Sequence, residues 1–229
     1  MLPGQVWYRK FAVGLVFFAV FSNQASVAEE SMSVAATNYL SALSVDDREQ
    51  SVFSLDDEER LNWHFVPHEM FPRSGILLKQ LNPQQREFAQ TLLASGLSER
   101  GYLTVTSIIQ LERVLNALEP DGPFVRDYEN YRVSVFGTPE SEGSWGWRFE
   151  GHHLSLHFTI VAGEVTVSSP TFLGSNPAEV RSGAQTEQQQ NQRVLAARED
   201  SGRSLVTALS DLQRTRAITS DTAPRDIVT

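Results

Sequence analysis

The feature that most restricts the fold of this chain is a strict alternation of apolar and polar residues in three runs between positions 131 and 160. Alternation with a period of two places the apolar side chains on one face of a β-strand, so each run predicts a half-buried strand. Ala162-Gly163 then predicts a short hairpin turn into a further strand at 164–168. Strands this close in sequence predict an antiparallel β-meander. The three alternating runs are 131–135, 145–149 and 154–160.

Helical patterns stand on both sides of the meander. Residues 31–55 have apolar residues at helical spacing and predict one or two helices. Asn82-Pro83 combines an N-cap residue with proline at the first helical position, and Gly96 suits the end of that helix. Ser98 opens a second pattern that extends to Leu118, and two helices joined this closely are expected to pack as an antiparallel pair.

After the meander, Asn176-Pro177 repeats the N-cap and proline pattern, and residues 187–218 predict one long helix. The inward-facing residues of that helix are expected to be Val194, Leu195, Leu205, Leu209 and Leu212. The predicted fold class is therefore α+β, with a helical N-terminal part, an antiparallel β-meander and a C-terminal helix. Residues 62–75 contain two prolines and a glycine and predict an ordered loop.

Residues 1–28 have the layout of a secretory signal peptide. Arg9 and Lys10 precede an apolar run, and Ser26 and Ala28 are the small residues that a signal peptidase requires. We expect cleavage after Ala28, an exported protein that is periplasmic or secreted, and a single domain from 29 to 229. The alternative is an uncleaved membrane anchor. The apolar run is shorter than the roughly 20 residues that a spanning helix needs, which favours cleavage and no stable anchor afterwards.

The net charge and the cysteine content limit the binding partners and the chemistry that this chain can have. Without its leader the chain has 28 acidic and 17 basic residues (19 less Arg9 and Lys10), a net charge of −11 with neutral histidines. Such an acidic chain repels a phosphate backbone, which argues against nucleic acid as a partner. The sequence contains no cysteine, so disulfides and thiolate chemistry are excluded.

Several short motifs, taken in order, resemble the DUF3500 family of exported proteins of unknown function. The resemblance extends from about Asp56 to the C-terminus and implies no reaction. It also implies that related chains continue past Thr229, so this chain is either a short member or lacks a C-terminal portion. The motifs are WxFxP and RxG (Trp63 to Gly75), LLxxGLSxxGY (Leu92 to Tyr102), RDxExYxVxVFG (Arg126 to Gly137), WGWRxEGHHLSL (Trp145 to Leu156) and PxFxGxNPAEVRSG (Pro170 to Gly183).

The histidines at 152, 153 and 157 invite a metal site for a divalent cation. On a regular strand, however, His153 and His157 would stand about 13 Å apart, too far to share one ion, and His152 would point to the opposite face. A metal site with His152 or His153 therefore needs ligands from elsewhere, and the loop at 62–75 offers His64, His68 and Glu69. The alternative is that these histidines are ordinary polar strand residues.

Our leading functional hypothesis is an enzyme, a hydrolase or a metal-dependent activity on a small-molecule or polymeric extracellular substrate. A bulge or turn at Gly151 would bring Glu150 beside His152 or His153. In that arrangement His153 is a base or ligand, Glu150 orients it and Arg148 holds an anionic group. A Ser155 nucleophile beside His153 and His157 is a weaker alternative, since the chain has no GxSxG elbow.

The rival hypothesis is a non-catalytic ligand-binding or envelope-structural protein. Aromatic and charged side chains together suit sugars, peptides or small anions. The same residues could instead be core tryptophans and structural ion pairs. The predicted ligand-binding residues are Trp63, Arg73, Arg126, Asp127, Trp145 and Trp147.

Overall fold

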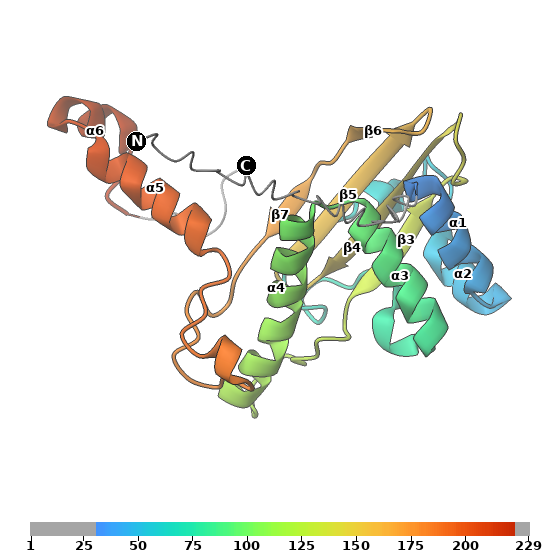
Figure 1. Ribbon diagram of the computed structural model, residues 1–229, viewed down its shortest axis with the longest axis horizontal. Coiled ribbons are helices and arrows are strands. Elements are labelled where there is room, and N and C mark those ends of the chain that lie inside the picture. The colour runs from blue at the N-terminus through green and yellow to red at the C-terminus, as the bar shows by residue number, and fades with distance from the viewer. Residues whose placement is uncertain (1–30, 223–229) are drawn as a thin grey trace, which may run out of the picture.

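The computed structural model describes residues 31–222 and has an α+β fold, as predicted (Figure 1). The predicted leader, residues 1–28, lies outside the described residues, as do residues 223–229. The helices are α1 (Met32–Ala42), α2 (Val45–Ser51), α3 (Pro83–Ser95), α4 (Glu99–Leu118), α5 (Ala196–Ala208) and α6 (Asp211–Ala217), with short 3-10 turns at η1 (Glu58–Leu61), η2 (Leu78–Gln80) and η3 (Glu187–Gln189). The strands are β1 (Val52–Phe53), β2 (Ile76–Leu77), β3 (Arg132–Phe136), β4 (Ser144–Gly151), β5 (Leu154–Val161), β6 (Glu164–Val167) and β7 (Thr171–Leu173).

The alternating runs form the centre of a single mixed sheet in the order β1-β3-β4-β5-β6. Strands β3 to β6 pair antiparallel, which confirms the predicted meander, while β1 pairs parallel with β3. Ala162 and Gly163 form the turn between β5 and β6, and both have positive φ (50° and 81°), as tight hairpin turns require. The two shorter strands β2 and β7 pair with β3 and β5.

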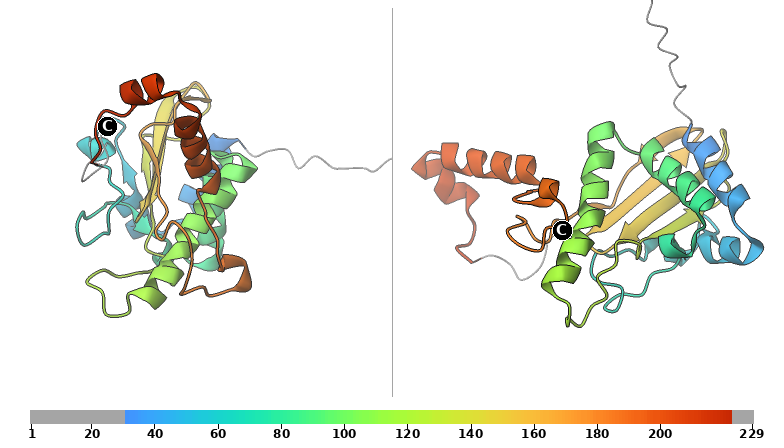
Figure 2. Two further views of the ribbon diagram at one scale, coloured as in Figure 1. Left: turned by 90° about the vertical axis from the view of Figure 1, so that its left-hand side faces the viewer. Right: turned by 60° about the horizontal axis from the view of Figure 1, so that its bottom comes forward.

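The apolar face of the sheet packs against helices α1, α3 and α4. The left view of Figure 2 shows these helices on one side of the sheet and the chain from about residue 56 to 80 on the other. Ring stacking of Trp147 on Phe158, with centroids 4.5 Å apart, joins β4 to β5 within this core. Burial of aromatic and aliphatic side chains between the two layers is the main stabilising contribution.

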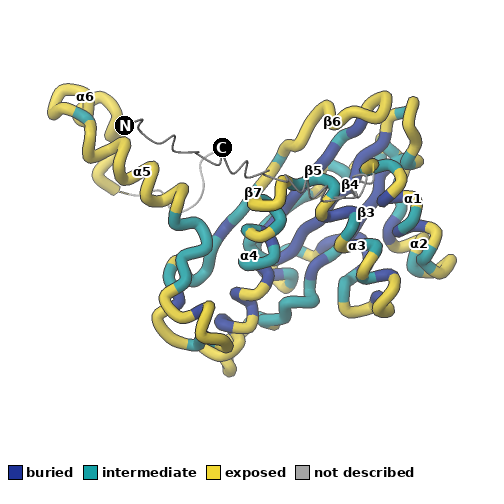
Figure 3. The backbone as a smooth tube through the Cα atoms, in the orientation of Figure 1, coloured by how far each residue is buried: buried dark blue, intermediate teal, exposed yellow. Residues whose placement is uncertain are grey.

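The polar face of the sheet is buried as well, which corrects the prediction of half-buried strands. Every residue from Trp145 to Gly151 is buried, and so are Ser134, Ser155 and His157. Figure 3 shows the buried residues running continuously along the central strands. The alternation correctly divides the two faces, but a period of two says nothing about which segment covers the polar one. Here residues 56–75, which include the predicted ordered loop at 62–75, cover it.

Helices α3 and α4 begin and end where their caps predict. The Asn82 side chain accepts a hydrogen bond from the backbone N–H of Gln85, and Ser98 does the same for Gly101. The predicted antiparallel pair is wrong, however, because α3 packs along α1 and meets α4 only at a few positions. The two helices therefore diverge from their connection (Figure 1).

The C-terminal region departs most from the predictions. Asn176-Pro177 begins no helix, and the chain around it is irregular. The long helix expected over 187–218 is instead divided into η3, α5 and α6, because Ser210 caps a new helix at Asp211. Leu205 and Leu212, expected to face inward, are each 65% exposed. Helices α5 and α6 project away from the sheet (Figures 1 and 3).

Within residues 31–222, no helix combines the length and apolar character needed to cross a membrane.

Candidate functional site

A buried group of charges lies between the polar face of β4 and residues 56–75. The Nε atom of Arg148 is 2.9 Å from Oε1 of Glu150, and the Nε atom of Arg73 is 3.7 Å from Oε2. None of the three side chains is more than 2% exposed. Two of the predicted catalytic residues, Arg148 and Glu150, are thus adjacent, together with the predicted ligand-binding Arg73.

The remaining donors of these arginines bind residues 56–75, which we call the covering segment. Arg148 donates to the backbone carbonyls of Glu59 (2.8 Å) and Asn62 (2.6 Å) and pairs with the Glu59 carboxylate at 2.6 Å. Arg73 donates to the carbonyl of Val66 at 2.6 Å. Because the guanidiniums bind oxygens of this chain, the group of charges joins β4 to residues 56–75.

Burial raises the pKa of Glu150 to about 7, although the guanidiniums of Arg148 and Arg73 and the His64 backbone N–H lower it. Arg132, the cross-strand partner of Glu150, adds a third cation beside this carboxylate. Removal from water therefore opposes ionisation of Glu150 even among positive charges.

Ser155 and His157 lie farther along the same polar face. Ser155 Oγ is 3.1 Å from Nε2 of His157, so the geometry joins two members of the weaker nucleophile hypothesis. Ser155 has no exposed surface. Trp63 meets the His157 ring edge-on at 6.1 Å, and burial followed by Arg148 and Arg60 lowers the pKa of His157 to about 3. This histidine is a neutral, covered side chain.

His152 belongs to a different group, on the side of α4. It lies with His153 in the two-residue turn that joins β4 to β5, and not within a continuous strand. Its Nδ1 is 2.5 Å from Oε1 of Glu112, a buried carboxylate of α4. The Tyr131 hydroxyl donates to the His152 carbonyl at 3.0 Å, which fixes the backbone of the turn.

Arg126 adds a cation to this second group. Its Nη1 lies 3.3 Å from Nδ1 and 3.5 Å from Nε2 of His152, and its Nε and Nη2 both donate to Glu119. The structure thus brings the predicted ligand-binding Arg126 to the predicted metal ligand His152. The side chain of His152 is 12% exposed and that of Glu112 4%, so the imidazole is the more accessible partner.

His153 is held mainly by its backbone. Its N–H donates to the Phe65 carbonyl at 2.7 Å, its carbonyl accepts from Gly174 at 2.8 Å, and its φ is 59°. The ring meets that of His152 edge-on, with centroids 4.0 Å apart. Burial, then the neighbouring His152 and Arg126, lowers the pKa of His153 to about 4.

The other predicted ligand-binding residues are dispersed. Trp145 and Trp147 are at most 1% exposed in the core, so their rings have no open surface to offer a ligand. Asp127 pairs with Lys79 at 3.4 Å on the surface. Trp63 meets the His157 ring edge-on.

A family model described as a protein of unknown function (DUF3500) matches residues 25–229. The chain belongs to the DUF3500 family. The resemblance in the motifs is thereby confirmed for nearly the whole chain. No curated protein and no solved structure matches it.

In the described part of this DUF3500 protein, the side chains around His152 and His153 do not form a set of metal ligands. Within residues 31–222, no three histidine, cysteine, aspartate or glutamate side chains converge as ligands of one ion would. His152 and His153 are adjacent, but Nδ1 of His152 is engaged by Glu112, and the Arg126 cation lies against the ring. His68 and Glu69 lie in the covering segment, where the Glu69 carboxylate accepts from the Val125 N–H.

Glu112 is the residue that the sequence analysis missed. It interrupts the apolar row Val105, Ile108, Ile109 and Leu115 of α4, all of which are buried. A carboxylate in such a row must find a partner when it is buried, and this expectation could have marked Glu112. The identity of its partner was not accessible, because His152 is 40 residues away.

Proposed function

We propose that this DUF3500 protein is a hydrolase in which His152 is the general base. The observation that carries the proposal is the 2.5 Å contact between Nδ1 of His152 and the buried Glu112 carboxylate. A carboxylate on Nδ1 fixes that nitrogen as the protonated one and leaves Nε2 to take a proton from water or from a substrate hydroxyl. Glu112 is then a positioning residue that also stabilises the imidazolium.

The position of Arg126 beside His152 suits it to bind a substrate. Two of its nitrogens are neutralised by Glu119, while Nη1 remains at the imidazole. A guanidinium in this place suits a substrate with an anionic group, or an oxyanion that develops during hydrolysis. We further propose that the reaction takes place outside the cytoplasm, which rests on the leader pattern of residues 1–28.

The test measures the turnover of chromogenic ester, phosphate and glycoside substrates by the wild type and by variants of His152, Glu112 and His153. His152→Ala should lower kcat by roughly 100- to 10,000-fold, the range for loss of a general base. Glu112→Gln should lower kcat and alter the pH profile, with an unchanged melting temperature as evidence of an intact fold. His153→Gln is the matched control, since His153 lies beside His152 without contacting Glu112.

Three results would contradict the proposal. Loss of turnover in Glu150→Gln and His153→Ala, with Glu112→Gln active, would transfer the chemistry to Arg148, Glu150 and His153. Metal bound in near-stoichiometric amount by the purified protein, with a melting temperature that falls on chelation, would favour a metal-dependent enzyme. A wild-type protein that turns over none of these substrates would favour the non-catalytic alternative, ligand binding or a structural role in the envelope.

A further inference from the structure

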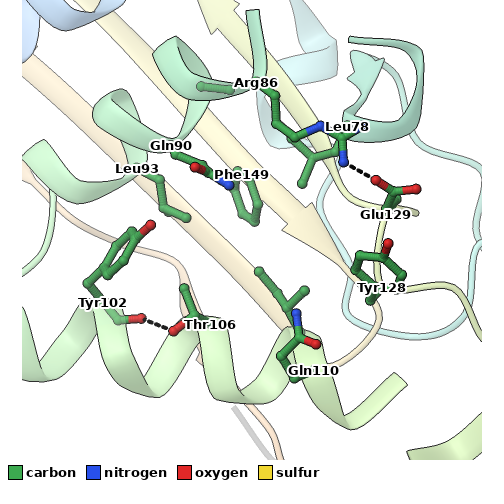
Figure 4. A pocket seen from close by; sticks show the side chains of 12 residues that line it. Leu78, Arg86, Gln90, Leu93, Tyr102, Thr106, Gln110, Tyr128, Glu129 and Phe149 are labelled. Atoms are coloured by element: carbon green, nitrogen blue, oxygen red, sulfur yellow. Dashed lines mark hydrogen bonds and ion pairs between the residues drawn. The ribbon is translucent and has the colours of Figure 1, made fainter. Parts of the chain in front are cut away.

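The divergence of α3 from α4 leaves a cleft of about 130 Å³ above the sheet. Figure 4 shows Phe149 of β4 between the two helices, with side chains of α3 on one side and of α4 on the other. This volume is smaller than the roughly 300–1,000 Å³ of sites for drug-sized ligands, so the cleft suits a ligand no larger than one sugar ring. The lining residues are Leu78, Arg86, Ala89, Gln90, Leu93, Tyr102, Thr106, Ile109, Gln110, Tyr128, Glu129 and Phe149.

The floor of the cleft is apolar. Leu93, Ile109 and Phe149 are buried members of the main core and reach the cleft with part of their surface. A ligand that enters must therefore present an apolar face to them, because a polar group there would lose its hydrogen bonds to water.

The rim of the cleft carries neutral polar groups that the protein leaves available. In the described part of the chain, the amide of Gln90 and the hydroxyls of Tyr102 and Tyr128 make no hydrogen bond to protein. The Gln110 carbonyl oxygen accepts from Arg113, which leaves the Gln110 NH₂ group as a donor. Amides and hydroxyls of this kind both donate and accept, as ligand hydroxyls do.

The cleft has no net charge. Its charged side chains are Arg86 and Glu129, and they form an ion pair with each other (Figure 4). An ionic ligand would have to displace one of these partners, whereas a neutral ligand can bond to their remaining donors and acceptors.

We propose that the cleft between α3 and α4 binds a neutral sugar. A pyranose has an apolar C–H face, which suits the floor, and a rim of hydroxyl groups, which suits the amides and phenols above it. This binding site is separate from the proposed catalytic group but adjacent to it. Tyr131 stacks on Phe149 of the floor and donates to the carbonyl of His152.

The test is a binding measurement on the purified protein by saturation-transfer NMR and calorimetry, and it does not depend on turnover. The probes are glucose, galactose, N-acetylglucosamine and cellobiose, with glucose 6-phosphate and glucuronate as charged counterparts. At least one neutral sugar should bind more tightly than the charged compounds. Gln90→Ala and Gln110→Ala should each weaken that binding by about tenfold, the effect of one lost hydrogen bond.

Gln84→Ala is the matched control, since Gln84 is an exposed glutamine of α3 that does not line the cleft. It should leave the affinity unchanged. Absence of binding by every neutral sugar would overturn the proposal. So would tighter binding of the charged counterparts, or binding that Gln90→Ala and Gln110→Ala leave intact.

Discussion

At the scale of single residues, burial and partners separate side chains that look equivalent in the sequence. Three histidines within six positions have three different roles in the fold. His152 pairs with Glu112, His153 lies in the turn between β4 and β5, and His157 shares a hydrogen bond with Ser155 beneath residues 56–75. Burial is the largest cause of the lowered pKa of His153 and of His157. A buried neutral imidazole makes folding sensitive to acid.

The pH dependence of stability follows from His157. Its pKa falls from 6.5 to about 3 on folding, so the unfolded chain binds the proton first as the pH decreases. Above pH 6.5 the histidine is neutral in both states and the folded state keeps its full stability. As the pH falls from 6.5 toward 3, proton binding to the unfolded chain lowers the free energy of unfolding. Chemical denaturation should show that the unfolding free energy of the wild type falls between pH 7 and pH 5. In His157→Gln the same fall should be about 2 kcal/mol smaller.

Glutamine in place of His157 retains a hydrogen-bonding partner for Ser155 but does not titrate. At pH 8, where the histidine is neutral in both states, the pH-dependent difference should vanish. Parallel stability curves for His157→Gln and the wild type would show that His157 titrates alike in the folded and unfolded chains.

At the scale of elements, the covering segment behaves as a part of the sheet although it contains little regular structure. Arg148 of β4 attaches it through the backbone carbonyls of residues 59 and 62, and Arg73, within the segment, binds the carbonyl of residue 66 and pairs with Glu150 of β4. In return, its oxygens satisfy guanidinium donors that would otherwise be buried without partners. The segment and the polar face of β4 therefore stabilise each other.

Loss of Arg148 should release this segment. Arg148→Ala leaves Glu150 buried without its closest cation, which costs about 3–5 kcal/mol for a buried ion pair. Urea denaturation should record that loss, and limited proteolysis should show new cleavage within residues 56–75. Arg181→Ala, at a surface pair with Glu179, should cost at most about 0.5 kcal/mol. If the two variants were equally stable, apolar contacts alone would hold the segment.

At the scale of the whole molecule, the chain has a body around the sheet and a C-terminal extension. No residue of α5 or α6 is buried, whereas Val180 and the partly buried Val194 and Leu195 pack against the core clusters. The extension adds little packing, because its large apolar side chains remain in water.

Truncation after Leu195 should therefore leave the melting temperature of the body unchanged within error. Truncation after Ser168 should lower it, because this removes β7 and the contact of Val180 with α4. Thermal unfolding followed by circular dichroism distinguishes the two variants. A large loss after the first truncation would mean that α5 and α6 contact the body in solution.

The features determined by the sequence alone are local. The alternation defines the faces of β3, β4 and β5, and the caps at Asn82 and Ser98 define two helix starts, since each depends on residues a few positions apart. The tertiary structure decided what covers the polar face, which carboxylate meets His152, and that α3 packs on α1. Each of these contacts joins segments that lie tens of residues apart in the sequence. Local patterns allow several partners for such a segment, and close packing of the whole chain selects one of them.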